Sequence, residues 1–514
     1  MVRLVPGSDL PAGGLARREV VRDKREEIIH TEALILRGAL ASKEDFVPAS
    51  HKEIEGVKAV SISDLRATLQ GRVISPGDPD YDKARSTFYG GIDRRPAAIV
   101  QVANAEDVSR VVSLVREDGL ELAIRSGGHS IAGHCVTEGG IVLNVSAMQS
   151  LHLDVERRVA WAGSGLTAGA YSVAAGAHGL ATGFGDSGSV GVGGITLAGG
   201  IGYLARKHGL TIDSLVAVEI VTADGKLVYA DCDEHPDLFW ALRGGGGNFG
   251  VVTRFQFRLH HVGTVVGGML ILPATPDVIA SFVAAAEEAP EELSTIANVM
   301  HAPPMPFLPV EVHGQPVIMA SLVYAGDVEQ GERAVAPFRT LATPIIDMLR
   351  PMPYPEIFPP EIPNYRPLAI GRTMFVNEVT RTMAESILDH LNKSTAQIRV
   401  AQIRVLGGAI TRVPPDATAY AHRAQRILVN VAAVYEQPGE SQLHSAWVAD
   451  FVSVLQPVPG AYVGFVGNEG EGRIHEAYPG RTWERLLEIK RRYDPANLFR
   501  LNQNIRPAGN GASQ

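Results

Sequence analysis

The sequence predicts an α+β protein with two mixed domains. Three observations lead to this class. Near residue 100, short β-branched runs alternate with an amphipathic helical run, and glycine-rich clusters follow until about residue 260. From residue 266 to 455, long amphipathic helices alternate with strands. The chain has 514 residues, of which 45% are hydrophobic, so it is long enough to bury two or three cores.

The first domain is expected to begin with a β-α-β unit. Residues 97–102 (AAIVQV) predict a strand, residues 106–119 an amphipathic helix with its valines on one face, and residues 120–128 a second strand. The next expected elements are strands at 139–146, 152–163, 216–230 and 251–259 and a helix at 167–179. Asp224-Gly225 predicts a hairpin turn within the third of these strands.

Changes in composition divide the chain into four segments. The predicted segments are 1–65 (N-terminal extension), 66–265 (first domain), 266–455 (second domain) and 456–514 (C-terminal segment). The extension is expected to hold a charged amphipathic helix at 15–40, with a shorter helix around 61–70. The C-terminal segment predicts a helix that ends at Tyr493-Asp494-Pro495. An arm that packs across a homodimer is one interpretation of the extension.

The charge balance and the cysteine content exclude several classes of protein. Lys plus Arg total 47 against 56 Asp plus Glu, a net charge of -9, which disfavours nucleic acid and anionic membranes as partners. No apolar run reaches the length of about 18 residues that a membrane span needs. Cys135 and Cys232 are the two cysteines, so a disulfide framework is not expected. A cytoplasmic location is the expectation, because the first residues lack the apolar core of a secretory signal.

Two glycine motifs, Gly200–Ala205 and Gly245–Gly250, match the spacing of dinucleotide-binding loops. A Rossmann site needs a strand before the motif and a helix after it. The second motif precedes a predicted strand, and the first follows another glycine cluster, so both are disfavoured. No Walker-type lysine follows either motif, which excludes a P-loop.

A different phosphate cradle is favoured. Arg125–Ser130 (RSGGHS) closes a predicted strand with small residues whose backbone N–H groups could surround a pyrophosphate. Gly185–Gly202 has almost no bulky side chains and could lie along a flat cofactor, although tight turns are the alternative for any single cluster. His129, His134 and Cys135 could suggest a metal site, but no second pair of ligands accompanies them, so no metal is expected.

In their order, these motifs resemble the vanillyl-alcohol oxidase/p-cresol methylhydroxylase superfamily of FAD-linked oxidases. The similarity is strongest to the berberine bridge enzyme-like branch, which includes bacterial hydroxynicotine oxidases. It is carried by residues 124–134, 189–210, 233–253 and 493–505, and it spans about residues 80–507. The resemblance implies a two-subdomain FAD-binding domain, an α+β substrate domain with an antiparallel sheet, and a C-terminal segment that returns to the FAD domain.

The resemblance also implies which residues bind FAD. They are Arg125, Ser126, Gly127, Gly128, His129, Ser130, His134, Gly185, Ser187, Val190, Gly193, Gly194, Gly199, Gly200, Gly202, Tyr203, Gly250, Val251, Val252, Asn502 and Asn504. In the family, the histidine of the first cluster is joined to the 8α-methyl group of the flavin, which implies a covalent link through His129. Many members add a cysteine at the flavin 6-position. Ser187 stands at that place, so a single covalent link is expected.

The implied activity is that of an FAD-dependent oxidase. Hydride passes from a small alcohol, amine or hydroxylated ring substrate to flavin N5, and O2 then accepts the electrons and becomes H2O2. Tyr462, Tyr478 and His208 are the candidate acid/base groups, although each could instead be a packing residue. The strand that carries a glutamate base in berberine bridge enzyme here offers Gln402 and Arg404. Two alternatives stay open, a dehydrogenase with another electron acceptor and a flavin-binding protein without turnover.

Overall fold

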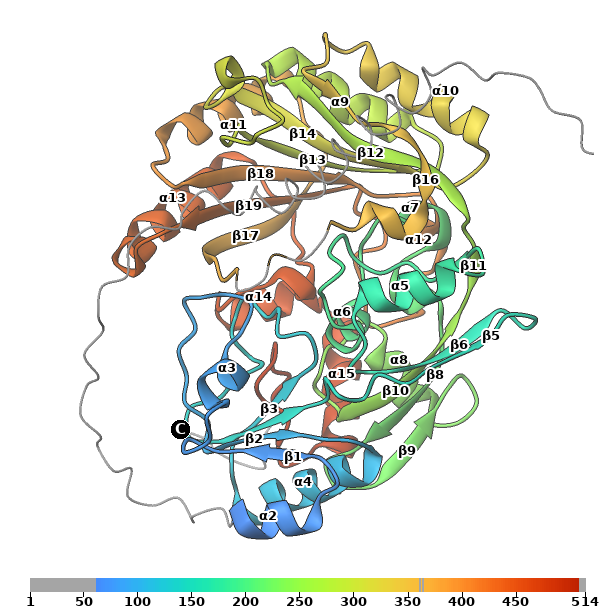
Figure 1. The fold of residues 1–514 in the computed structure, drawn as a ribbon, viewed down its shortest axis with the longest axis vertical. Helices are drawn as coiled ribbons and strands as arrows, with labels where there is room; N and C mark the ends of the chain where they lie inside the picture. The colour runs from blue at the N-terminus through green and yellow to red at the C-terminus, as the bar shows by residue number, and fades with distance from the viewer. Residues whose placement is uncertain (1–61, 360–361, 363–364, 508–514) are drawn as a thin grey trace, which may run out of the picture.

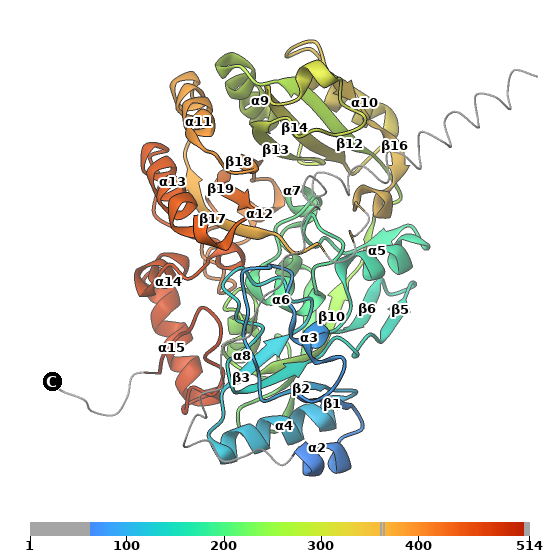
Figure 2. The ribbon, with the colours of Figure 1, turned by 60° about the vertical axis from the view of Figure 1, so that its left-hand side comes forward.

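The computed structural model describes residues 62–359, 362 and 365–507, and it has an α+β fold (Figure 1). One large sheet and its helices make up the upper part of the molecule in Figure 1, and two smaller sheets lie in the lower part. Figure 2 shows the same upper and lower parts after a turn of 60° about the vertical axis. The predicted helix at 15–40 lies outside the described residues, as does the predicted extension 1–65 apart from residues 62–65.

The first small sheet contains the predicted β-α-β unit. Its strands, in spatial order, are β1 (Arg72–Ile74), β2 (Ala98–Gln101), β4 (Ile141–Asn144) and β3 (Leu122–Arg125). The strands β2 and β3 both pair in parallel with β4, which lies between them. Its helices are α2 (Ile62–Thr68), α3 (Tyr81–Arg85) and α4 (Ala105–Asp118). The side chain of Asn104 caps α4, and Gly119, at φ 68°, ends it.

The second small sheet is antiparallel throughout. Its strands, in spatial order, are β5 (Leu151–Asp154), β6 (Val159–Gly163), β10 (Val251–Arg258), β8 (Leu215–Val221) and β9 (Leu227–Ala230). The prediction of one strand over 152–163 is wrong, because a turn with Arg158 at φ 54° splits it into the β5–β6 hairpin. The hairpin turn at Asp224-Gly225 is confirmed, with Gly225 at φ 81°.

Helices and a short ribbon surround this second sheet. The helices are α5 (Ala168–Gly176), α6 (Val192–Ala198), α8 (Pro236–Leu242), α14 (Glu471–Ala477) and α15 (Arg481–Tyr493), and the ribbon pairs β7 (Leu180–Ala181) with β11 (His260–His261). The short helix α7 (Ala205–His208) packs instead against strand β13 (Leu293–His301) of the large sheet. The predicted helix at 167–179 is therefore confirmed as α5. Leu486 of α15 is buried in the core of this sheet, so the C-terminal helix packs on the lower part of the molecule (Figure 1).

The large sheet has eight strands, and all their pairings are antiparallel. In spatial order they are β15 (Ile346–Asp347), β12 (Thr264–Pro273), β14 (Pro316–Tyr324), β13 (Leu293–His301), β18 (Ile398–Val405), β19 (Ile427–Tyr435) and β17 (Leu368–Val376), with β16 (Arg350–Pro353) also paired to β12. The helices that cover one face are α9 (Pro276–Glu288), α10 (Val328–Arg339), α11 (Arg381–Lys393) and α13 (Ser441–Val454), while α12 (Ala409–Arg412) follows β18. Ala401 and Ile403 pack among these helices, so alternation along β18 turns Gln402 and Arg404 to the opposite face.

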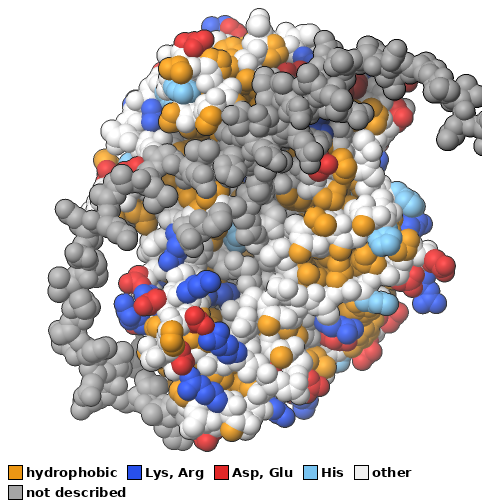
Figure 3. Space-filling model, in the orientation of Figure 1, with side chains coloured by type: hydrophobic (Ala, Val, Ile, Leu, Met, Phe, Trp, Pro, Cys, Tyr) orange, Lys and Arg blue, Asp and Glu red, His pale blue; other side chains and the backbone are white. Residues whose placement is uncertain are grey.

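Charged side chains of both signs are interspersed over the lower part of the face drawn in Figure 3, so neither sign forms a broad field there. Among the described residues, no helix is both long and apolar enough to cross a bilayer.

A buried ion pair holds the chain where α15 ends. The Nζ atom of Lys490 lies 2.7 Å from Oδ2 of Asp494, and both side chains are 0% exposed. Lys490 also donates to the carbonyl oxygens of Asn248 and Phe499, at 2.8 and 2.9 Å. Asp494 accepts the backbone N–H groups of Leu498 and Phe499. The predicted end of the helix at Tyr493 is confirmed, and this pair fixes the path of the tail that follows.

We expect Lys490→Met to lower the free energy of unfolding by roughly 3–5 kcal/mol, because it leaves the buried charge of Asp494 without its partner. Thermal unfolding followed by circular dichroism measures the change. Lys226→Met is the matched control, since Lys226 forms an ion pair with Asp224 at a side chain that is 78% exposed. Equal unfolding midpoints for the two variants would contradict the structural role of the buried pair.

Candidate active site

The first and second glycine clusters lie backbone against backbone. A Cβ atom on Gly127 would lie 2.3 Å from the backbone nitrogen of Gly191, and one on Gly191 would lie as close to the nitrogen of Gly127. No side chain fits at either position. Ser126 adds a bond from its Oγ to the carbonyl oxygen of Ser164, at 2.7 Å. The loop after β3 and the loop before α6 therefore form one continuous surface.

His129 is held within this surface. Its ring stacks on Phe88 with a centroid distance of 4.2 Å and an interplanar angle of 21°. Burial lowers the pKa of His129 to about 4, and a hydrogen bond with the backbone of Ser189 acts in the opposite direction. The imidazole is therefore neutral at neutral pH, which is the form with a free lone pair for nucleophilic attack.

The other polar residues of the first cluster support the loop itself. The buried guanidinium of Arg125 donates to the carbonyl oxygens of Cys135 (3.2 Å), Arg85 (3.0 Å) and Ala84. Because Nε, Nη1 and Nη2 all bond backbone oxygens, the side chain of Arg125 connects the end of β3 to the backbone at residues 84–85 and 135. Ser130 Oγ accepts the backbone N–H of His134, at 3.2 Å.

His134 and Gly128 complete the first cluster. Burial, with a smaller contribution from the charge of Arg94, lowers the pKa of His134 to about 4. Gly128 has a φ of 76°, and a Cβ atom there would meet nothing within 4 Å. The backbone of the first cluster thus turns at Gly128, and the space beside this residue is open.

The second cluster also depends on close packing, but one position is open. A Cβ atom on Gly202 would lie 1.7 Å from the carbonyl oxygen of Phe184, and one on Gly200 would lie 1.9 Å from Oγ1 of Thr211. In contrast, a Cβ atom on Gly194 would meet nothing within 4 Å. This pattern leaves a strip of bare backbone along α6.

The remaining predicted residues of this cluster line or support the same strip. The carbonyl oxygen of Val190 accepts the N–H of Ala168, at 2.9 Å. The hydroxyls of Ser187 and Ser189 lie 3.1 Å apart. Four predicted residues remain, and each lies against a neighbour. A Cβ atom on Gly185 would meet Ile195, one on Gly193 would meet Ser126 and the carbonyl oxygen of Ser164, and one on Gly199 would meet Tyr462 and Tyr420. The ring of Tyr203 packs edge-on against the ring of Phe358.

The C-terminal tail closes around the third glycine cluster. Asn248 donates to the carbonyl oxygen of Gln503, at 3.1 Å, and accepts the N–H of Ile505, at 3.0 Å. Asn502 donates to the carbonyl oxygen of Gly247, at 3.0 Å. The N–H of Gly246 donates to the carbonyl oxygen of Leu197 in α6, also at 3.0 Å. The three clusters and the tail are thereby brought together in one bed.

Two acceptors in this bed have no hydrogen-bond partner among the described residues. They are the buried Oδ1 atoms of Asn502 and Asn504. The tail bonds Asn248, which is followed by Gly250 and by Val251 and Val252, the first residues of β10. A Cβ atom on Gly250 would lie 2.5 Å from the carbonyl oxygen of Val221. Buried polar atoms normally find partners, so these acceptors are suited to a polar ligand.

The three predicted acid/base candidates have different partners. The hydroxyl of Tyr462 accepts the N–H of Gly200 at 3.1 Å, and that of Tyr478 donates to the carbonyl oxygen of Gly244 at 3.3 Å. Burial raises the pKa of both phenols, so both are protonated at neutral pH. His208 instead stacks on His260, with ring centroids 4.1 Å apart. Burial and the nearby charge of His260 lower the pKa of His208 to about 3.

An ion pair joins the second cluster to the large sheet, and one of its two residues, Asp186, was not predicted as a site residue. Asp186 Oδ2 accepts from Arg404 Nη2 at 2.6 Å, joining the loop before Ser187 to β18. Phe88, which packs on His129, was also missed. No local pattern marks either residue, because their partners are distant in the sequence.

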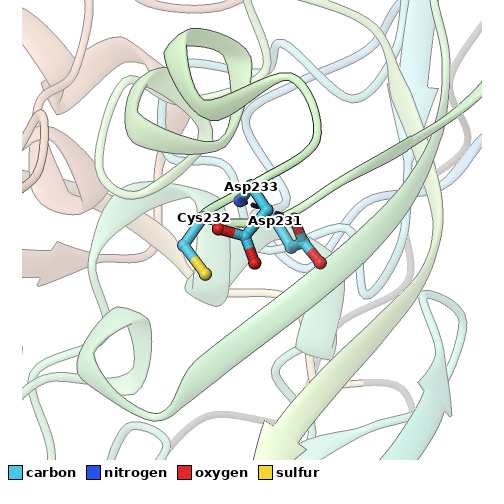
Figure 4. A group of neighbouring side chains, drawn as sticks. All are labelled: Asp231, Cys232 and Asp233. Carbon is cyan, nitrogen blue, oxygen red and sulfur yellow. Dashed lines mark hydrogen bonds between the residues drawn. The ribbon is translucent and has the colours of Figure 1, made fainter.

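One group of potential metal ligands occurs among the described residues, at Asp231, Cys232 and Asp233 (Figure 4). Asp231 Oδ1 already accepts the backbone N–H groups of Asp233 and Glu234, at 2.8 and 2.7 Å. Cys232 and Asp233 are exposed. The group is a turn that precedes α8, and we assign no metal to it.

Comparisons with known proteins agree with this geometry. The family model described as FAD binding domain matches residues 96–231, and the one described as berberine and berberine like matches residues 461–506. The (R)-6-hydroxynicotine oxidase of Paenarthrobacter nicotinovorans is 30% identical over 461 residues, which cover 86% of this chain and 98% of the relative. The xylooligosaccharide oxidase of Thermothelomyces thermophilus is 26% identical, with 88% and 95% of the two chains covered.

The crystal structure of 6-hydroxy-D-nicotine oxidase from Arthrobacter nicotinovorans has a TM-score of 0.78 to this chain at 27% identity, and 86% of this chain and 99% of the other are covered. Fold and sequence together define an FAD-linked oxidoreductase. Within that class, the chain belongs to the berberine bridge enzyme-like family.

The residues of the bed fit FAD. The backbone is open at Gly128 and Gly194, where a Cβ atom would meet nothing within 4 Å, so a ligand can approach it closely. The backbone N–H groups of the first cluster are suited to a pyrophosphate. The unpartnered oxygens of Asn502 and Asn504 can accept hydrogen bonds from N–H or O–H groups of such a ligand.

We expect Gly127→Ala to reduce the flavin content of the purified protein by at least half, because the new Cβ atom forces the two glycine loops apart. The ratio of flavin absorbance to protein absorbance measures it. Gly77→Ala is the control, since a Cβ atom there would meet nothing within 4 Å and its φ lies outside the left-handed region. Full flavin content in Gly127→Ala would show that the contact between the loops is not needed for binding.

Proposed function

We propose that this protein is an oxidase that carries FAD on a single covalent bond, from His129 to the 8α-carbon of the flavin. The observation that carries the proposal is the state of His129, a residue of the first glycine cluster that is neutral, stacked on Phe88 and bonded to the backbone of Ser189 in the second cluster. The hydroxyl of Ser187 cannot replace the thiol that would form a second bond. Cys135 is buried and Cys232 is exposed in the turn before α8.

The proposed reaction is oxidation of a small alcohol, amine or hydroxylated ring substrate, with O2 reduced to H2O2. FAD bound in the bed supplies a two-electron hydride acceptor. The backbone of the first cluster would hold the pyrophosphate, and Asn502 and Asn504 would bond the cofactor from the tail. The oxidase names of the hydroxynicotine and xylooligosaccharide relatives favour O2 as the acceptor.

Among the three acid/base candidates, we propose Tyr462 as the group that acts on substrate. Its hydroxyl accepts from Gly200 and keeps its own proton available for donation, since its pKa is raised by burial. Tyr478 uses its proton on the carbonyl oxygen of Gly244, and His208 packs against His260. Tyr462 is thus suited to orient an oxygen or nitrogen atom of the substrate by donating a hydrogen bond to it.

We expect His129→Ala to bind FAD that dissociates on denaturation, because the variant lacks the nucleophile that forms the bond. Fluorescence of the protein band on a denaturing gel measures retention. His134→Ala should keep the fluorescent band, since His134 has a similarly lowered pKa but lies outside the contact between Phe88 and His129. Fluorescence retained by His129→Ala would place the attachment elsewhere.

The electron acceptor decides between an oxidase and a dehydrogenase. We expect chemically reduced enzyme to reoxidise in air-saturated buffer at least tenfold faster than free reduced flavin, with H2O2 formed in equal amount to flavin. Stopped-flow absorbance and a peroxide assay measure the two quantities. Slow reoxidation in air with fast reoxidation by a quinone would favour the dehydrogenase. A flavin that no substrate and no sulfite can bleach would favour a binding protein without turnover.

A further inference from the structure

A row of polar side chains crosses the face of the large sheet that is turned away from its helices. Asn298 of β13 is directly opposite Gln402 of β18, and Gln402 Nε2 donates to Asn298 Oδ1 at 2.9 Å. Arg404 follows on the same face. The next opposed pair on the same face, Met300 and Val400, lies two residues further along each strand and is apolar. The face therefore changes from polar to apolar between neighbouring pairs of side chains.

Arg404 is fixed in this row by three kinds of contact. Its Nε and Nη2 atoms donate to Gln402 Oε1 at 3.0 and 2.6 Å, and Nη2 also donates to Asp186 at 2.6 Å. The guanidinium lies over the ring of Phe465, 5.2 Å from its centroid. The residue is only 4% exposed. A long and flexible side chain is thus held in one orientation before any ligand arrives.

One end of the guanidinium remains available. The Nη1 atom of Arg404 is buried and has no hydrogen-bond partner among the described residues. A buried donor without a partner is costly, and a charged donor more so. Because Nε and Nη2 are both hydrogen-bonded, the guanidinium is oriented in advance, and Nη1 is the nitrogen that can donate to a ligand.

This open donor borders the proposed flavin site. Asp186 immediately precedes Ser187, which stands where other family members carry the second flavin attachment. The ring of Phe465, over which the guanidinium of Arg404 lies, packs edge-on against the ring of Tyr462, with centroids 5.0 Å apart. The ion pair is therefore next to Ser187 on one side and one aromatic ring away from the proposed substrate-orienting tyrosine.

We infer that Arg404 Nη1 binds an uncharged oxygen of the substrate, a hydroxyl or carbonyl group, and that Asp186 sets this preference for neutral substrates. The inference rests on the proposed function. Asp186 neutralises Arg404, so an incoming carboxylate would lose its solvation without gaining a net attraction. A neutral oxygen is desolvated at far lower cost and still accepts a hydrogen bond from a charged donor.

The test compares benzamide and benzoate, which share a ring and differ in the charge of the acceptor. Each is titrated into the flavin-loaded enzyme, and the change in flavin absorbance gives the Kd. We expect the wild type to bind benzamide at least tenfold more tightly than benzoate. Asp186→Asn leaves the charge of Arg404 uncompensated, so benzoate should bind at least tenfold more tightly than in the wild type, and the order should reverse.

Two further variants complete the test. Asp186→Asn combined with Arg404→Met removes the pair without leaving a buried charge, so it stays informative if the single variant does not fold. It should weaken benzamide binding about tenfold, the loss of one hydrogen bond to a charged group. Arg412→Met is the matched control, because Arg412 pairs with Glu291 at a side chain that is 60% exposed, and it should leave both Kd values unchanged.

Three results would overturn the inference. They are an unchanged order of affinities in Asp186→Asn, an unchanged Kd for benzamide in the double variant, and no absorbance change with either compound in the wild type. A shifted flavin spectrum in the double variant, with benzamide binding intact, would assign the Nη1 donor to the cofactor instead. Flavin fluorescence on a denaturing gel reports the His129 bond independently, so failure of the proposed attachment is distinguishable from failure of the substrate assignment.

Discussion

The close approach of two backbone segments, at Gly127 and Gly191, is the constraint on which the rest of the site depends. Without side chains there, the loop after β3 and the loop before α6 share one surface, and no other residue type could bring them to this distance. His129 takes its position from that surface and from Phe88. The loop that follows the first small sheet thus supplies His129, the proposed attachment residue, and the segment around α6 supplies the glycine-rich backbone beside it.

Buried charge fixes the remaining parts of the site in place. The Lys490–Asp494 pair holds the tail that carries Asn502 and Asn504 against the third glycine cluster. The Asp186–Arg404 pair joins that lower part of the molecule to β18 of the large sheet. Each pair compensates a charge that would be costly if buried alone. Both pairs therefore favour one arrangement of segments that are far apart in the sequence.

The large sheet contributes a face of mixed chemistry, because alternate residues of each strand point to opposite sides. One side packs against four helices, mostly through apolar side chains. The other side presents Asn298, Gln402 and Arg404 beside methionine and valine side chains. A polar row of this kind is suited to selection among substrates, whereas the glycine-rich bed below it is suited to holding a cofactor common to the whole family.

The sequence by itself determined the α+β class, the hairpin at Asp224-Gly225, the end of α15 and the motifs of an FAD-linked oxidoreductase, since each depends on residues close together in the chain. It placed Arg125 in a predicted cradle of backbone N–H groups, and the structure adds that the donor nitrogens of its side chain bond backbone oxygens. Only the tertiary structure brought Phe88 to His129, Asp186 to Arg404 and His260 to His208. Such contacts depend on how distant segments pack, and local patterns of hydrophobicity and glycine carry no record of that packing.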